Sequence, residues 1–189
     1  MTDINIWNID TSLLIDYKNN GWVDDYFIET KDGKYGIHIY NIEEWRMSSY
    51  AGIFALFKDR QDSKPLLNSP NNWVWFNNDK TIIYAPLSDC LIFRMPAYQK
   101  KSKRPDFPFI IINPKEQKFG FIEWDATSIY YTFKEQEKNI LIIQELYPAE
   151  LKLLKKSKPD KDFFDLKDIN WFDIKLLKNA IGIYHSMPF

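Results

Sequence analysis

The stretch FPFIIINPKEQKFGFIEWDATSIYY, residues 107–131, decides the fold of this 189-residue chain. Two apolar runs rich in isoleucine and phenylalanine flank a polar segment at 113–117 that contains Asn and Pro. Aromatic and β-branched residues favour strands, and Asn and Pro between two such runs mark a tight connection. The stretch therefore predicts an antiparallel hairpin, followed by an exposed corner at 124–127 and a neighbouring core strand.

Strand signals of the same kind recur along residues 22–146. Asp32 and Gly33 separate two runs of aromatic and β-branched residues, which is a strong hairpin signal. Short strands spaced about 8–12 residues apart predict a meandering antiparallel sheet, folded as a sandwich or a partial barrel. Two segments break this pattern, because 41–52 has the N-cap residue and composition of a short helix and 134–138 has the composition of a charged loop.

Helices are predicted near both ends of the chain. Residues 10–21 combine an N-cap, an apolar stripe and a final glycine. A helical C-terminal part is expected over 148–182, with a first helix opening at Pro148, a linker at 157–162 and a second helix over 168–182. The apolar positions of that second helix are Ile169, Trp171, Phe172, Ile174, Leu176, Leu177 and Ile181, and the final IYHSMPF is expected to add an edge strand. The whole chain, 1–189, is thus predicted to be one α+β domain that is mostly antiparallel sheet.

Composition argues against most enzyme classes. The chain has one cysteine, two histidines and six glycines, and it lacks a phosphate loop, a dinucleotide fingerprint, a nucleophile elbow and a zinc-binding helix motif. Cys90 precedes the apolar residues LIF, so we expect a buried structural thiol, and neither His38 nor His185 has a motif partner. We therefore predict no cofactor and no metal site, and we lean against an enzyme.

The start of the chain predicts a cytoplasmic protein. The segment MTDINIWNIDTSLL is acidic and has neither the basic nor the apolar region of a secretory signal. No apolar run approaches the ~18 residues that a membrane span needs. We therefore expect no membrane association.

Aromatic residues are the most unusual feature, at 17% of the chain with seven tryptophans. Trp and Tyr supply large contact areas with few torsions to freeze, and they dominate the energetics of protein interfaces. The leading hypothesis is therefore a non-enzymatic module that binds another protein. The candidate contact residues lie at predicted turns or strand ends, and they are Trp45, Trp73, Trp75, Glu123, Trp124 and Asp125.

Two other functions stay open. Glu123 and Asp125 alternate with Trp124 and would share one face of a continued strand, as the paired carboxylates of a carbohydrate hydrolase do. Alternatively, the basic run KKSKR at 100–104 and the aromatic strands would suit single-stranded nucleic acid. The net charge of -1 and the sequence pI near 6.1 make nucleic acid the less expected partner.

The runs NNWVWFNNDKTIIYAPLSDCLIF and FPFIIINPKEQKFGFIEWDATSIYY resemble the small, aromatic, β-rich immunity proteins of bacterial toxin systems. The resemblance covers residues 71–131, about a third of the chain, and no diagnostic motif accompanies it. It implies a cytoplasmic protein that binds one cognate toxin and masks its active site. Such masking places an acidic or aromatic patch against a basic cleft, for which the acidic residues of 1–50 and the pair Glu123 and Asp125 are the candidates.

Overall fold

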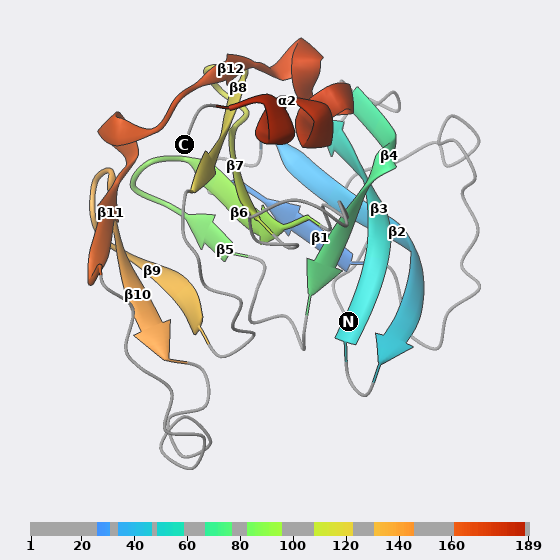
Figure 1. The fold of residues 1–189 in the computed structure, drawn as a ribbon, viewed down its shortest axis with the longest axis horizontal. Coiled ribbons are helices and arrows are strands. Elements are labelled where there is room, and N and C mark those ends of the chain that lie inside the picture. Colours follow the sequence, from blue (N-terminus) through green and yellow to red (C-terminus); the bar gives the residue numbers. More distant parts are fainter. Residues whose placement is uncertain are drawn as a thin grey trace.

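Antiparallel strands dominate the fold, which we describe from a computed structural model (Figure 1). The structure describes residues 26–30, 34–46, 49–58, 67–76, 83–95, 108–122, 131–145 and 161–187. A helix lies at the C-terminal end of this part of the chain and packs against the sheet. The prediction of an α+β fold that is mostly antiparallel sheet is confirmed. The helices expected at 10–21 and at Pro148 fall outside the described residues.

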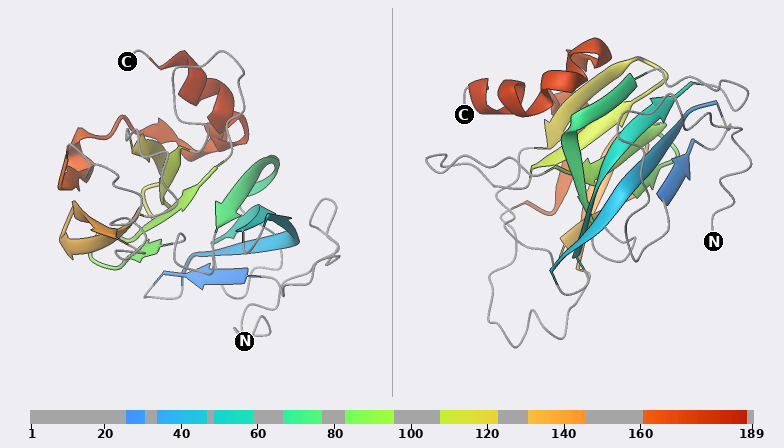
Figure 2. Two further views of the ribbon diagram at one scale, coloured as in Figure 1. Left: turned by 60° about the horizontal axis from the view of Figure 1, so that its bottom comes forward. Right: turned by 90° about the vertical axis from the view of Figure 1, so that its right-hand side faces the viewer.

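The described strands form two sheets (Figures 1 and 2). The larger sheet has the order β1-β2-β3-β4-β6-β7-β8-β12, with β5 paired to β6, and the smaller has the order β11-β10-β9. The larger contains β1 (Tyr26–Glu29), β2 (Gly36–Arg46), β3 (Ser49–Phe57), β4 (Leu67–Phe76), β5 (Ile83–Ala85), β6 (Cys90–Arg94), β7 (Phe109–Asn113), β8 (Lys118–Ile122) and β12 (Phe172–Asp173). The smaller contains β9 (Tyr131–Glu137), β10 (Ile140–Glu145) and β11 (Phe163–Asp165).

The hairpin predicted at the centre of the sequence is confirmed. Strands β7 and β8 pair with Ile111 opposite Gly120, and the Gln117 amide donates a 3.3 Å hydrogen bond to the Pro114 carbonyl across the turn. Gln117 adopts φ 54, the left-handed conformation that closes this turn. The pairing of β1 with β2 around Asp32 and Gly33 is confirmed as well. The corner after β8 lies outside the described residues, and the strand beyond it, β9, belongs to the other sheet.

Strands β6, β7 and β8 are buried on both faces. One set of their side chains meets the C-terminal helix, and we call this the helix-side core. The alternate set meets the smaller sheet, and we call this the sheet-side core. In β6, for example, Phe93 belongs to the helix-side core and Ile92 to the sheet-side core. Strands buried on both faces need continuous apolar runs, which explains sequences such as CLIF and FIII.

The sheet-side core also holds a charged side chain at one end. Arg94 is 1% exposed, and its guanidinium lies 4.2 Å from the centre of the Phe109 ring. Burial lowers the pKa of Arg94 from its ordinary value to about 10, so the group stays protonated at neutral pH. An aromatic face stabilises such a cation, because the ring carries negative charge density above its plane. The Arg94 stem and head thus fill a position that the sequence pattern assigns to an apolar residue.

The C-terminal helix begins later than predicted. It consists of a 3₁₀ helix η4 (Ile174–Asn179) followed by α2 (Ala180–Ser186). The prediction of a helix over 168–182 is therefore wrong in its first part. The edge strand predicted at the end of the chain is also wrong, because Ile183–Ser186 are helical. The reason is tertiary: β12 pairs with β8, and the Asp173 side chain then caps η4 by accepting a 2.8 Å hydrogen bond from the Lys175 amide. The buried positions are Ile174, Leu177, Ala180 and Tyr184, whereas Leu176 of the predicted stripe is 48% exposed.

Two other local predictions were wrong. The segment 41–52 was expected to be helical, but its described residues continue β2 as far as Arg46 and begin β3 at Ser49. Pairing of β2 with β3, and of β3 with β4, outweighs local helix propensity there. The segment 134–138, expected to be a loop, is strand as far as Glu137. The turn to β10 needs only Lys138 and Asn139, because Asn139 adopts φ 69.

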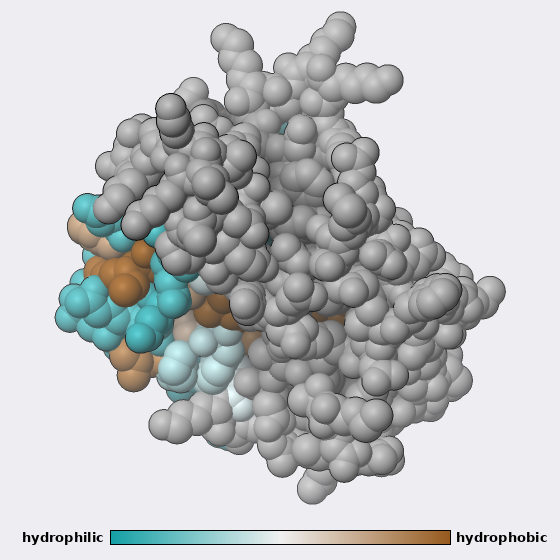
Figure 3. All heavy atoms as spheres, turned by 90° about the horizontal axis from the view of Figure 1, so that it is seen from below, coloured by the Kyte–Doolittle hydropathy of each residue, from teal (hydrophilic) through white to brown (hydrophobic). Residues whose placement is uncertain are grey.

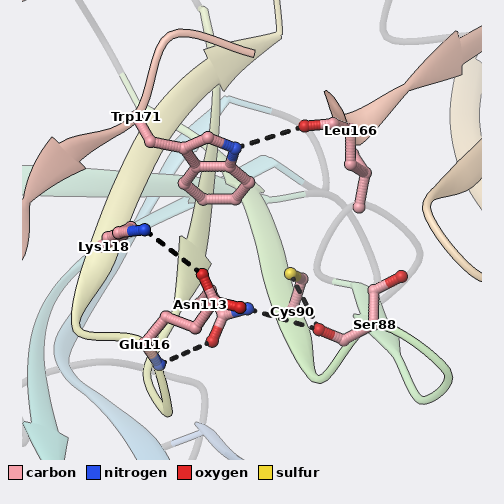
Figure 4. A network of polar contacts seen from close by, with 7 residues as sticks. All are labelled: Ser88, Cys90, Asn113, Glu116, Lys118, Leu166 and Trp171. Atoms are coloured by element: carbon pink, nitrogen blue, oxygen red, sulfur yellow. Dashed lines mark hydrogen bonds and ion pairs between the residues drawn. The ribbon is translucent and has the colours of Figure 1, made fainter. Parts of the chain in front are cut away.

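A carboxylate joins the two sheets. Glu135 of β9 accepts a 2.6 Å hydrogen bond from the Leu87 amide and another from the Ser88 hydroxyl, both in the turn between β5 and β6. The Ser88 hydroxyl oxygen in turn accepts a 2.8 Å bond from the Asn139 amide. The Ser88 carbonyl accepts from the Cys90 thiol at 3.2 Å and from the Asn113 side chain at 3.5 Å (Figure 4). These bonds tie three turns of different strand pairs at one end of the molecule.

We predict that Phe93→Ala lowers the free energy of unfolding by about 3–5 kcal/mol, because it opens a cavity between the larger sheet and the helix. Phe93 is fully buried, and its ring centre lies 5.2 Å from that of Phe54. Urea titration followed by tryptophan fluorescence measures the change. As a control, Leu176→Ala on the exposed face should change stability by less than about 0.5 kcal/mol. Equal effects of the two substitutions would contradict the burial described here.

Candidate functional site

A pocket of about 600 Å³ lies between the smaller sheet and the end of β8. Strand β11 and the residues just before it form one wall, and the end of β8 forms another. The segment that crosses from the smaller sheet to the larger one, residues 166–171, completes the pocket, and we call it the crossing segment. The lining residues are Phe121, Ile122, Lys161, Asp162, Phe163, Phe164, Asp165, Asp168, Ile169 and Asn170. On the face shown in Figure 3, the coloured part on the side of the smaller sheet carries hydrophobic side chains framed by hydrophilic ones.

The β11 wall is fixed to β10 by backbone hydrogen bonds. The Ile143 amide donates to the Asp162 carbonyl at 3.1 Å, and the Leu166 amide donates to the Asn139 carbonyl at 2.7 Å. Between these bonds, Phe164 lies opposite Leu141 and points into the sheet-side core. Its neighbour Phe163 therefore projects the other way, and it is 55% exposed.

The crossing segment is held by its own turn and by close packing on β8. Asp165 caps the short 3₁₀ helix η3 (Leu166–Asp168) by accepting a 2.9 Å bond from the Lys167 amide. The Trp171 indole donates a 3.2 Å bond to the Leu166 carbonyl (Figure 4). At Gly120, a Cβ atom would lie 2.9 Å from the Asn170 carbonyl oxygen and would collide with Ile169. Only glycine lets the two backbones approach this closely.

The pocket carries an excess of acidic groups. Three aspartates line it, Asp162, Asp165 and Asp168, against one lysine. That lysine, Lys161, stacks over the Phe164 ring at 5.4 Å from its centre. Carboxylates beside an exposed aromatic ring form a surface that attracts a cationic group and offers it an apolar contact. The arrangement therefore suits binding of a basic partner.

The site residues predicted from the sequence lie elsewhere or outside the described residues. Trp45 lies in β2, and Trp73 and Trp75 lie in β4, which is separated from β8 by β6 and β7. The structure describes the backbone at these tryptophans but not their side chains, so their role as contacts stays a prediction. The corner with Glu123, Trp124 and Asp125 falls outside the described residues, although it follows directly in sequence on Ile122, which lines the pocket.

None of the residues that line the pocket was predicted from the sequence to be a contact residue. The segment 157–162 was expected to be a linker, and Asp168 was expected to begin a helix. A signal was present in KDFFDLKD, residues 161–168, where two phenylalanines stand among alternating charges. Burial of only one of two adjacent phenylalanines is typical of an edge strand, and the exposed one then becomes available for contact.

Cys90 is buried, as the sequence predicted. Burial, reinforced by the nearby Glu135 carboxylate, raises the pKa of the Cys90 thiol from 9.0 to about 12. A thiol with that pKa is not a nucleophile at neutral pH. In the described part of the chain, no three histidine, cysteine, aspartate or glutamate side chains gather as metal ligands would. None of the helices described has the length and hydrophobicity needed to span a lipid bilayer.

No protein-family model, no curated protein and no solved structure matches this chain. The function of the pocket between β8 and β11 is therefore inferred from the residues that line it.

We predict that Gly120→Ala destabilises the protein by about 1–3 kcal/mol, because the added methyl group forces apart β8 and the crossing segment. The matched control is Gly182→Ala in the exposed helix α2. There the atoms nearest to the new Cβ all belong to the Asn179 side chain, with its oxygen at 2.6 Å, and that side chain can rotate away. Alanine also raises helix propensity by up to about 1 kcal/mol. Thermal denaturation of both variants measures the difference. A Gly120→Ala variant as stable as the Gly182→Ala variant would contradict the close approach.

We also predict that Cys90 makes stability depend on pH in the alkaline range. The folded pKa of about 12 is higher than the ordinary value of 9.0, so the unfolded chain loses its thiol proton first as the pH rises. The stabilisation from the protonated thiol is complete below about pH 9 and is lost between about pH 9 and pH 12. Denaturation curves of the wild type and of Cys90→Ala should therefore converge or cross in that range. A constant stability difference, or a native thiol that reacts with an aromatic disulfide as fast as free cysteine, would contradict this.

Proposed function

We propose that this protein is a protein-binding module and that the pocket bordered by β8 and β11 is its contact surface. The observation that carries the proposal is the exposed Phe163 ring, which is 55% exposed, on a pocket lined by three aspartates. Large aromatic side chains supply most of the affinity at protein interfaces, and surrounding charges select the partner. The expected partner is another protein with a basic surface.

The resemblance to immunity proteins leads to a more specific form of the proposal. In that form, the partner is one cognate bacterial toxin, and the acidic pocket covers a basic catalytic cleft in the cytoplasm. Asp162 and Asp168 are exposed, so their carboxylates stay hydrated in the free protein and are accessible to cationic side chains of a partner. Complementary charge of this kind also speeds association.

The two alternatives receive less support from the described part of the chain. The hydrolase hypothesis depends on Glu123 and Asp125, and the nucleic-acid hypothesis depends on residues 100–104, all of which lie outside the described residues. The pocket itself carries three carboxylates, which repel phosphate groups. A protein partner is therefore the function that the described surface favours.

The test is affinity capture from the native host with wild type and variants as bait. Phe163→Ala removes the exposed ring, and Asp162→Asn combined with Asp168→Asn removes two charges without changing side-chain size. Loss of a central aromatic contact typically costs about 2 kcal/mol or more, or roughly 30-fold in affinity. We expect one stoichiometric protein that the wild type retains and both pocket variants lose. Quantitative mass spectrometry of the captured proteins measures this.

Leu176→Ala on the exposed face of the C-terminal helix is the matched control, and it should retain the partner. A partner captured equally by wild type and pocket variants would place the contact surface elsewhere, and capture of none would overturn the proposal. Expression of the partner alone, and then together with this protein, tests the immunity form. Growth arrest that co-expression relieves supports it, whereas a harmless partner overturns that form and leaves the binding function.

A further inference from the structure

We infer that the outer edge of β11 binds an extended, basic segment of the partner as an added β-strand. This inference rests on the proposed function, because it names the mode of binding and the chemistry of the partner at the same pocket. It depends on the direction of the β11 backbone groups, on the wall that faces them, and on the charges around them.

Two backbone hydrogen bonds, from the Ile143 amide to the Asp162 carbonyl and from the Leu166 amide to the Asn139 carbonyl, fix which β11 groups face β10. Asp162 and Leu166 each bond to β10 or its turn, and in an antiparallel pair the bonded positions alternate. Phe164 therefore faces β10 as well, opposite Leu141. The Phe163 amide and carbonyl and the Asp165 amide must then point away from β10, toward the outer edge.

Those three outward groups have no hydrogen-bond partner within the described ranges of the chain. The strand order β11-β10-β9 makes β11 an edge strand of the described part of the smaller sheet, and the strand itself contains no proline. The segment FFD instead presents an exposed phenylalanine at this edge. An edge with unpaired backbone groups and an apolar side chain is a template for strand addition.

The opposite wall of the pocket is a second strand edge. The Ile174 amide bonds to the Gln117 carbonyl at 2.9 Å, so by alternation Phe121 also directs its backbone groups toward the β12 side of β8. Strand β12 pairs only with Lys118 and Phe119, so it ends before reaching Phe121. Phe121 and Phe163 both line the pocket. The pocket therefore lies between the β11 edge and the end of β8 that β12 leaves unpaired.

Charge selects the occupant. The strand edge and its flanks carry Asp162, Asp165 and Asp168 against Lys161. A second copy of this chain would bring the same aspartates against them, and like charges at close range oppose that pairing. An extended partner segment with arginine or lysine at alternate positions would place its cations beside the carboxylates, because alternate residues share one face of a strand.

Amide hydrogen exchange by NMR tests the inference, with a synthetic peptide of alternating arginine and valine as the probe. In the absence of peptide, the Phe163 and Asp165 amides should exchange fast and the Phe164 amide slowly. Saturating peptide should slow exchange at Phe163 and Asp165 at least about tenfold, as expected for amides that gain hydrogen bonds. Phe164 should change little. The same peptide with every backbone nitrogen methylated keeps every charge and side chain but has no edge that can pair with a strand, and it should give no protection.

Substitutions at Phe163 distinguish the contribution of its backbone amide to peptide binding from the contribution of its ring. Phe163→Pro removes an outward amide without breaking the pairing to β10, since edge strands tolerate proline at such positions. It should weaken peptide binding several-fold beyond Phe163→Ala, which removes the ring alone. Asp162→Asn combined with Asp168→Asn should weaken binding and reduce its salt dependence, whereas Glu137→Gln, at an exposed position of β9, should leave both unchanged. An acidic peptide of alternating glutamate and valine should not bind.

Three outcomes overturn the inference. Equal binding of the methylated and unmethylated peptides excludes strand addition. Protection of Phe163 that appears without peptide and rises with protein concentration identifies a second copy as the occupant. A captured partner that depends on the pocket but leaves Phe163 and Asp165 unprotected contradicts strand addition while the proposed function stands. Conversely, the peptide could protect the Phe163 and Asp165 amides although no partner is captured from the host. That result would support strand addition at the β11 edge and count against the proposed function.

Discussion

Burial of β6, β7 and β8 on both faces is the constraint on which the rest of the described structure depends. A central strand whose two faces are apolar must be covered twice, and each buried isoleucine or phenylalanine contributes about 1.5–3 kcal/mol when it leaves water. The C-terminal helix covers one face and the smaller sheet covers the other. The pocket lies where these layers meet, since the chain must cross from the smaller sheet to the larger one to place the helix.

The position of the smaller sheet is set by polar groups as well as by packing. Glu135 reaches from β9 to the turn before β6, and Ser88 links that turn to Asn139. A carboxylate that accepts two hydrogen bonds is held in one geometry, and each bond to it is stronger than one between neutral groups. Asn139 in turn accepts from Leu166, immediately after β11. The strand edge at the pocket is therefore connected through a continuous set of hydrogen bonds to the centre of the larger sheet.

The sequence was informative where local signals and tertiary structure agree. The polar segment 113–117 between two apolar runs, and the Asp32-Gly33 pair, each marked a hairpin that the structure confirms. Prediction failed where pairing partners decide the outcome. The segment 41–52 has helix-forming residues, yet its described residues are strand, because β2 and β3 pair with each other there and β3 also pairs with β4. The start of the C-terminal helix was misplaced because β12, only two residues long, is recognisable only beside β8.

The site was harder to predict than the fold, for a physical reason. Which of two adjacent phenylalanines is exposed depends on the register of β11 against β10, and no local pattern in FFD encodes that register. Aromatic content led to protein contact as a hypothesis, but it could not distinguish the buried rings from an exposed ring such as Phe163. Phe109, Phe119, Phe121 and Phe133 are all buried, whereas Phe163 is not.

The most direct test of the central claim is the footprint of the captured partner on the isotope-labelled protein, mapped by amide chemical-shift changes in NMR. The largest chemical-shift changes are expected on β11, on the crossing segment that follows it and on the end of β8. Changes centred on the C-terminal helix, or on β1 to β4, with no response in the pocket, would contradict the claim that this pocket is the binding surface.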